Sequence, residues 1–341
     1  MSKISDLNVS FRPLWDLTYQ AVKTNLLISG INLGVFNVLT EWKNSEEVAK
    51  SIETHPKNTK ALLDALASMD LVKKSNGKYQ NATISNTFLV AGKSTYIGGF
   101  LAISDSWNIP SAEMMTQLIK NGPPPPDPNV NLGSMELWSQ ILRSAGNSQR
   151  AGVGQTLAYI VSKLPEFPNM KRMLDLGGGA GLIGICIVDS HPTMEGVIFD
   201  QPAVVQVADE FIKEYNMESR VKAMDGNYMT DSIGENYDLI LASQTLGFAG
   251  NELDSLLKKL YSSLNAGGVL ITMHEGLTLE KTKPSSMVLA TVGTVLRGSK
   301  ELRFFEAGET AEAMMRAGFK SIYRFPVELD CGEEEIAIAR K

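Results

Sequence analysis

"LDLGGGAGLIG", Leu174 to Gly184, is the stretch that decides the fold of this chain of 341 residues. It places five glycines within eight residues, directly after a short apolar run that is typical of a buried strand. Because glycine has no Cβ, such a turn lets the backbone approach a ligand closely at the start of the following helix. The sequence therefore predicts a strand, a tight ligand-binding turn and a helix, and leaves open which ligand the turn binds.

Two ligand classes fit this turn. Residues 179–184 match G-x-G-x-x-G, the dinucleotide fingerprint, in which a pyrophosphate lies at a helix N-terminus. Asp175 followed by Gly177 and Gly179 is instead an acidic residue before G-x-G, a pattern typical of S-adenosylmethionine sites. Both classes require a carboxylate at the end of the second strand for the ribose hydroxyls, and Asp200 in "VIFDQP" has that position. The glycine pattern alone does not choose between them.

The chain from Lys171 onward alternates between strand and helix patterns. The expected order is "RMLDLGG" strand, "LIGICIVDSH" helix, "EGVIFD" strand, "AVVQVADEFIKEY" helix, "RVKAMDG" and "YDLILAS" strands, "ELDSLLKKLYSSL" helix and "GVLITMHE" strand. A further helix and two extended segments follow from residue 304 onward. Such alternation predicts an α/β fold with a doubly wound, mainly parallel sheet. No second mononucleotide-binding half follows it, which favours the S-adenosylmethionine site.

The N-terminal part predicts helices followed by a hairpin. Amphipathic helices are expected from Ser10 to Leu39, after a cap at Ser45 and after a cap at Thr59. Asn76-Gly77 then supplies the positive φ angles of a type I′ turn, so the order is that of a winged helix. Residues 1–90 hold 10 Lys and Arg against 8 Asp and Glu, too balanced for a DNA-binding face. A dimerisation module is therefore favoured over a DNA-binding regulator.

Proline at positions 123–126 breaks any helix there and indicates a surface linker. The expected domains are residues 1–120, a winged-helix dimerisation and substrate-lid domain; 121–168, a linker with connecting helices; and 169–341, the cofactor-binding catalytic domain. The formal charge of −6 and the pI near 5.3 argue against a nucleic-acid partner. No apolar stretch approaches the roughly 20 residues of a membrane span, and Cys186 and Cys331 lie far apart, so a cytoplasmic protein without a structural metal is expected.

Five motifs in order carry a resemblance to a known family. They are "LDLGGGAG", "FDQP", "DGNY", "LNAGGVLI" and "MMRAGF", between Met170 and Arg340. This part resembles the class I S-adenosylmethionine-dependent methyltransferases, with their Rossmann-like sheet. The whole chain resembles the small-molecule O-methyltransferase family that includes plant caffeic-acid-type and bacterial polyketide enzymes. The resemblance implies S-adenosylmethionine as the cofactor, a homodimer formed by the mainly α-helical winged-helix domain, and a small-molecule acceptor.

The resemblance also implies a set of cofactor-binding residues. Asp175, Gly177 and Gly179 serve the methionine end of the cofactor, and Asp200 with Gln201 serves the ribose. Gly226, Asn227 and Tyr228 flank the adenine, and Ser243 lies beside the sulfonium. The family usually has Asp at the position of Asn227, but an amide oxygen also accepts a hydrogen bond from the adenine amine.

The general base of the family is missing. A phenol has a pKa of about 10, so a base assists its methylation at neutral pH. The family uses the histidine of an H-D-W triplet after the fourth strand, where this chain has Leu246-Gly247-Phe248. The chain has three histidines: His55 in a loop of the N-terminal domain, His191 in an expected surface turn, and His274 at the end of the fifth strand. His274, with Glu275 beside it, is the candidate for catalysis.

The acceptor is expected between the two domains, against apolar residues. The candidates for its walls are Trp107, Met114, Met115, Trp138, Phe248 and Met287. The expected function is methyl transfer from S-adenosylmethionine to a small aromatic or conjugated acceptor, at oxygen. The alternatives are methylation of carbon, nitrogen or sulfur without a general base, a homologue that binds the cofactor but has lost methyl transfer, and a winged-helix regulator.

Overall fold

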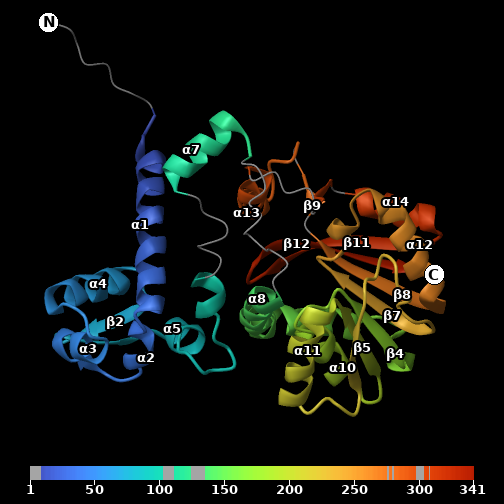
Figure 1. Ribbon diagram of the computed structural model, residues 1–341, viewed down its shortest axis with the longest axis horizontal. Coiled ribbons are helices and arrows are strands. Elements are labelled where there is room, and N and C mark those ends of the chain that lie inside the picture. The colour runs from blue at the N-terminus through green and yellow to red at the C-terminus, as the bar shows by residue number, and fades with distance from the viewer. Residues whose placement is uncertain are drawn as a thin grey trace, which may run out of the picture. The chain divides into compact units, whose positions relative to one another are not determined.

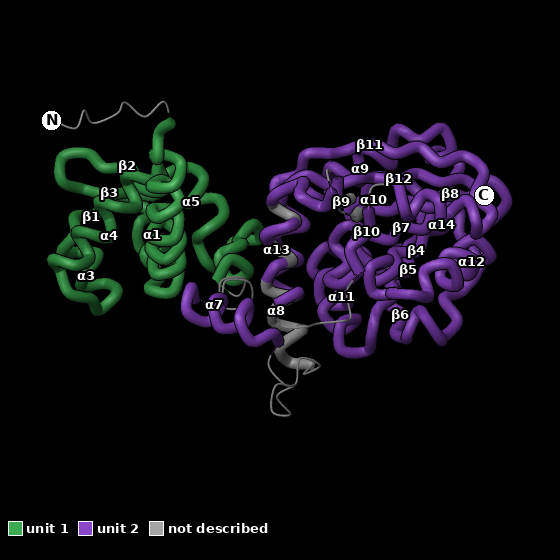
Figure 2. Tube along the Cα trace, turned by 90° about the horizontal axis from the view of Figure 1, so that it is seen from above, with its two compact units in different colours: residues 1–105 green, residues 106–341 purple. Residues whose placement is uncertain are grey.

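The computed structural model describes residues 9–102, 111–123, 135–274, 276–278, 280–296, 303–306 and 308–341. For some of them, among them Trp138, His274 and Met287, only the backbone is described. The chain divides into two compact units, residues 1–105 and 106–341 (Figure 2). The finer division at residues 120 and 168 stays a prediction. Within the described residues, no helix is both long enough and apolar enough to cross a membrane.

The first unit has the helix and hairpin order that the sequence predicts. The hairpin strands β2 and β3 are joined by Asn76 and Gly77, with φ of 47° and 75°, as a type I′ turn requires. Phe36, Leu63 and Tyr79 are almost fully buried and form part of its core. Its elements are α1 (Arg12–Asn32), α2 (Val35–Val38), β1 (Lys43–Asn44), α3 (Ser45–Ser51), α4 (Pro56–Ser68), β2 (Val72–Ser75), β3 (Lys78–Asn81) and α5 (Thr83–Phe88), with sheet order β1-β3-β2.

Both predicted helix caps of this unit are wrong. The cap of α3 is Asn44 and not Ser45: Asn44 Oδ1 accepts from the N–H groups of Glu46 and Glu47, and the Glu47 carboxylate accepts from the Asn44 N–H at 2.7 Å. This reciprocal box needs a glutamate three residues after the cap, which Glu47 supplies for Asn44. α4 begins at Pro56, a favoured first helical residue, so Thr59 lies inside the helix and is buried.

The second unit is the predicted doubly wound α/β fold. Its seven-stranded sheet has the order β11-β12-β8-β7-β4-β5-β6. β4 to β8 are parallel to one another, and β12 runs antiparallel to both of its neighbours, β8 and β11. The elements up to the third strand are α7 (Ala112–Asn121), α8 (Met135–Ser148), a π-helical turn (Gln149–Val153), α9 (Gly154–Ser162), η2 (Phe167–Asn169), β4 (Arg172–Leu176), α10 (Leu182–Asp189), β5 (Glu195–Asp200), α11 (Pro202–Glu214) and β6 (Val221–Asp225). They are followed by β7 (Tyr237–Ser243), η3 (Leu246–Glu252), α12 (Leu253–Ser263), β8 (Leu264–His274), β9 (Gly276–Leu277), α13 (Ser285–Leu296), β10 (Phe305–Glu306), α14 (Glu309–Ala317), β11 (Ser321–Leu329) and β12 (Gly332–Arg340).

Helices cover both faces of this sheet (Figure 1). One face packs against α9, α10 and α11, and the other against α12 and α14, each through its own apolar cluster. In a parallel sheet the carboxyl ends of the strands lie at one edge, which is where ligands bind in such folds. The ends of β4, β5 and β7 therefore bring the glycine turn, Asp200 and Ser243 to the same edge.

Candidate cofactor site

The glycine turn between β4 and α10 has the left-handed backbone that its sequence predicts. Gly177, Gly179 and Gly181 have φ of 64°, 59° and 77°, which side chains other than glycine rarely adopt. A Cβ at Gly177 or Gly181 would lie within 2.6 Å of a neighbouring side chain, whereas a Cβ at Gly179 would meet only Leu142, at 3.4 Å. Gly177 and Gly181 are therefore needed for packing, while Gly179 leaves open space beside the backbone.

Asp175 lies beneath this turn and not in the open space. It is 1% exposed, and its Oδ2 accepts a hydrogen bond from the Gly184 N–H at 3.0 Å. Burial, helped by the nearby Asp200 carboxylate and opposed by the hydrogen bond from Gly184, raises the pKa of Asp175 to about 7. Asp175 thus links the end of β4 to the first turn of α10 beneath the glycines, and its role in cofactor binding stays a prediction.

Asp200, at the end of β5, joins the turn to the second strand. Its Oδ2 accepts from the Gly179 N–H at 2.9 Å, and its Oδ1 accepts from the Gln201 N–H at 2.7 Å. Burial raises the pKa of Asp200 above its usual range, although both hydrogen bonds favour the charged form. Each carboxylate oxygen has a second lone pair, so the group is placed to accept from two neighbouring hydroxyls, as a ribose offers.

Residues 226–231, after β6, form a closed turn next to Asp200. The Gly226 N–H donates to the Asp200 carbonyl at 3.0 Å. Asn227 Oδ1 accepts from the Met229 N–H at 2.9 Å, which leaves one further lone pair of this oxygen for a ligand. The Tyr228 ring is half-buried, and burial, followed by the charge of Asp200, raises its pKa to about 12. Its phenol is therefore neutral at physiological pH.

Ser243 lies at the same edge, at the end of β7. Next to it, sequence reasoning missed Thr245, which contacts both β7 and β4. The Thr245 hydroxyl lies 2.8 Å from the Leu176 carbonyl and 3.0 Å from the Ser243 carbonyl, and it packs against Gly177. The structure thus brings together the predicted residues of the turn, of β5, of the 226–231 loop and of β7. Of the predicted set, Gln201 contributes through its backbone N–H, and its side chain is exposed.

The histidines differ in their surroundings. The turn around His191 lies at the surface, with Ser190 and Pro192 exposed, as predicted. The His191 side chain itself is 2% exposed, and its Nδ1 accepts from the N–H groups of Thr193 and Met194. Its ring packs edge-on against Phe167, so this one side chain of the turn points into the protein. His55 is the N-cap residue of α4. His274 ends β8 and pairs with Glu335 of β12, while its side chain and the whole of Glu275 lie outside the described residues.

Part of the expected acceptor wall is described. Met114 and Met115 lie on α7, which contacts α13, the helix that carries Met287. Met114 and Phe248 are 53% and 52% exposed. Trp107 and the side chains of Trp138 and Met287 lie outside the described residues. The role of all six in binding the acceptor stays a prediction.

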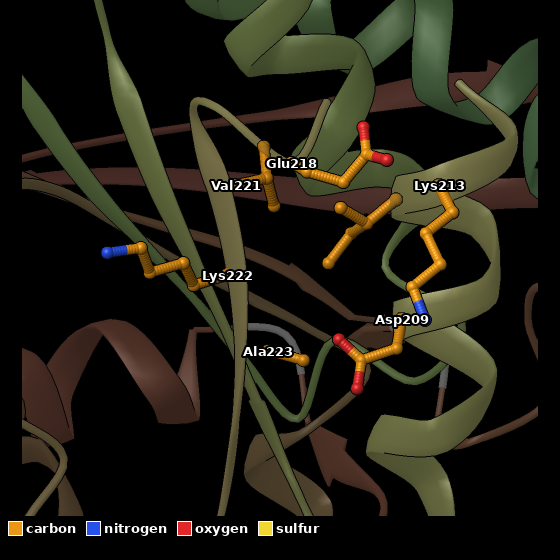
Figure 3. A pocket seen from close by; sticks show the side chains of 7 residues that line it. Asp209, Lys213, Glu218, Val221, Lys222 and Ala223 are labelled. Carbon is orange, nitrogen blue, oxygen red and sulfur yellow. The ribbon is translucent and has the colours of Figure 1, made fainter. Parts of the chain in front are cut away.

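A cavity of about 300 Å³ lies elsewhere, at the edge strand of the sheet. Asp209 and Lys213 of α11 face Val221 and Ala223 of β6 across it (Figure 3). None of the predicted cofactor residues lines this cavity. It is therefore separate from the site at the carboxyl edge.

Two family models match the chain. Residues 145–320 match the O-methyltransferase domain, and residues 15–91 match the O-methyltransferase dimerisation domain. Together they cover most of the described chain, in the order that the motifs predicted.

Curated relatives and solved structures agree with these matches. A 3-hydroxy-5-methyl-1-naphthoate 3-O-methyltransferase from Streptomyces sahachiroi is 23% identical, over 83% of this chain and 82% of its own. The N,N-dimethyltransferase OxyT from Streptomyces rimosus is 23% identical over 76% and 77%. Human N-acetylserotonin methyltransferase, solved in complex with S-adenosylmethionine, aligns with a TM-score of 0.80 at 20% identity, over 100% and 99% of the two chains. An O-methyltransferase family protein from Burkholderia thailandensis gives 0.80 at 17% identity, over 98% and 99%.

Proposed function

The chain belongs to the O-methyltransferase family, as an S-adenosylmethionine-dependent methyltransferase, and we propose that it methylates a small aromatic or conjugated acceptor at oxygen. The observation that carries the proposal is the hydrogen bond from the Gly179 N–H to Asp200, which fixes the glycine turn against the carboxylate of the second strand. The named relatives act on a naphthoate and on acetylserotonin, which supports an aromatic acceptor.

These residues fit the cofactor by their shape and their donor set. Gly179 leaves room for the methionine part, Asp200 offers acceptors for the ribose, and the 226–231 loop flanks the adenine. When bound, the cofactor would supply a methyl group on a positively charged sulfur, which would leave as a neutral thioether, and the acceptor hydroxyl would lose its proton to a base or to solvent. The protein aligns the two reactants and excludes water.

Calorimetry with S-adenosylhomocysteine tests the cofactor site. Replacing Asp200 by Ala removes the acceptors for the ribose and the partner of the Gly179 N–H, so we expect the affinity to fall by at least tenfold. The matched control is Asp209→Ala, which removes an exposed carboxylate from the adjoining helix α11. Unchanged affinity in the Asp200 variant, or binding of NAD in place of the adenosyl ligand, contradicts the proposal.

A nitrogen acceptor is the second candidate, because the base of the family is absent. Leu246, which stands where the replaced triplet has its histidine, is buried and has no group that could accept a proton. A neutral amine needs no base to attack the methyl group, and the relative OxyT is an N,N-dimethyltransferase. Turnover of a phenol that rises with pH towards the pKa of that phenol supports oxygen methylation without a base. Turnover of arylamines alone favours nitrogen.

The proposal includes a homodimer formed by the first unit, which the dimerisation-domain match supports. It also includes His274 and Glu275 as the candidate proton acceptors and the three-domain division at residues 120 and 168. A cytoplasmic location belongs to it as well.

A further inference from the structure

Lys259 of α12 extends towards the loop that flanks the adenine position. Its Nζ donates to the Tyr228 carbonyl at 2.8 Å and also to the Asp231 carbonyl. An ammonium group has three donors, so both bonds form at once. A side chain from a helix on one face of the sheet therefore holds two points of a loop at the edge of the sheet.

The 226–231 loop closes on itself and is then fixed from outside. Asp231 Oδ2 accepts from the Asn227 N–H at 2.8 Å, Asp231 Oδ1 accepts from the Thr230 hydroxyl, and the Asp231 N–H donates to the Asn227 carbonyl at 2.7 Å. Outward hydrogen bonds lie on two sides: Gly226 to the Asp200 carbonyl, and Lys259 to the far end of the loop. Lys259 thus holds the side of the loop that lies away from its hydrogen bond to Asp200.

The surroundings of Lys259 show that this contact is built into the fold. The side chain is half-buried, and burial lowers its pKa, against the attraction of Asp231. A half-buried lysine is costly unless its donors are used, and here both described acceptors are loop carbonyls. Lys258, the adjoining residue of α12, is exposed instead. The helix therefore presents two lysines of equal charge, of which one holds the loop.

We propose that Lys259 is a positioning residue that sets the preference of the cofactor site for adenine, by holding Asn227 and Tyr228 at a fixed distance from Asp200. This inference rests on the proposed function, because it takes the 226–231 loop as the adenine side of the site. Without the lysine, the carbonyls of Tyr228 and Asp231 lose their hydrogen-bond donor, and the loop moves away from the adenine position.

The test compares two ligands and two variants. Calorimetry measures S-adenosylhomocysteine and S-inosylhomocysteine, which differ at the six-position of the base, on the wild type, Lys259→Met and Lys258→Met. We expect the wild type to prefer the adenosyl ligand. In Lys259→Met we expect the affinity for it to fall about tenfold and the ratio of the two dissociation constants to shrink, whereas Lys258→Met keeps both.

The ratio of the two dissociation constants separates this role from a merely structural one, because general destabilisation weakens the binding of both ligands alike. If Lys259→Met keeps the wild-type ratio of the two dissociation constants, the inference is overturned, whatever the melting temperature of the variant. If the Met variant does not fold, the ratio in Lys259→Gln decides in the same way. A wild type that binds neither ligand overturns the proposed function itself, so the two failures are distinguishable.

Discussion

At the scale of the residue, Asp175 stands out because it is an acid whose side chain is almost fully buried. It is a carboxyl buried under a turn of glycines, with the Gly184 N–H as its hydrogen-bond donor and Asp200 as a second acid nearby. Its pKa in the folded protein is about 7, against 3.8 for an unperturbed aspartate. Between these two values the folded protein keeps a proton that the unfolded chain has released. The Asp175 contribution therefore lowers stability as the pH rises from about 4 to about 7, and is constant above that.

Asp175→Asn should remove this pH dependence. The amide keeps an oxygen for the Gly184 N–H but does not titrate, so the variant should gain stability relative to the wild type as the pH rises. Between pH 4 and pH 7.5, the free energy of unfolding of the variant relative to that of the wild type should rise by an amount on the order of 2–4 kcal/mol. Chemical denaturation at four pH values measures it. Parallel curves for the two proteins would contradict the raised pKa.

The sequence predicted single residues well where a motif requires a special backbone, and poorly where burial decides. The glycines of the turn and Asp200 follow from the ligand-binding pattern, and the structure joins them by hydrogen bonds. The surface turn that holds His191 was predicted, but the burial of its side chain was not, because the ring packs against Phe167 from another segment. Lys259 gives no signal in the sequence, since its partners are backbone carbonyls about 30 residues away.

At the scale of the element, the glycine turn has two kinds of position. A Cβ at Gly181 would lie 2.4 Å from Ile198 Cδ1, inside the packed interface with β5. Gly179 has a similar positive φ, but beside open space. The cost of alanine should therefore differ in kind between the two: overpacking at Gly181, and backbone strain with obstruction of the ligand at Gly179.

We expect Gly181→Ala to lose about 2–4 kcal/mol of folding stability, as overpacking and strain add. Gly179→Ala should lose about 1 kcal/mol from strain alone, yet weaken S-adenosylhomocysteine binding at least tenfold. Thermal unfolding and calorimetry on both variants check the pair. If Gly179→Ala binds as tightly as the wild type, the cofactor does not approach that side of the turn.

Elements were predicted where periodicity or turn chemistry is strong. Asn76-Gly77 predicted the hairpin of the first unit, and the alternation of strands and helices along the chain predicted a mainly parallel sheet, but not the order of its strands. The start of α3 was predicted one residue late, because Asn44 and Ser45 both cap helices and only the partner Glu47 distinguishes them. α13 was not among the predicted helices; its residue Met287 was named only as a candidate for the acceptor wall, and that role stays a prediction.

At the scale of the whole molecule, α1 is the feature that a single chain does not explain. This helix of 21 residues buries only Gly30, while Leu14, Leu17 and Val22 are 70%, 66% and 52% exposed. Its N-terminal half extends beyond the other helices of its own unit (Figure 1). An apolar helix that is left in water loses the tertiary packing that stabilises most helices. The match to a dimerisation domain supports a second copy of the chain as what covers it.

Two charges on this helix should therefore separate the dimer. In Leu14→Glu/Leu17→Glu, carboxylates replace apolar side chains three residues apart, and burying them at an interface costs several kcal/mol. Light scattering after size exclusion should give a wild-type mass near twice 37.2 kDa and a variant mass near that of one chain. The control is Met315→Glu/Tyr323→Glu, which changes two similarly exposed residues of the second unit and should stay dimeric. A dimeric α1 variant with native circular dichroism would mean that another surface joins the copies, and a monomeric wild type would remove the homodimer from the proposal.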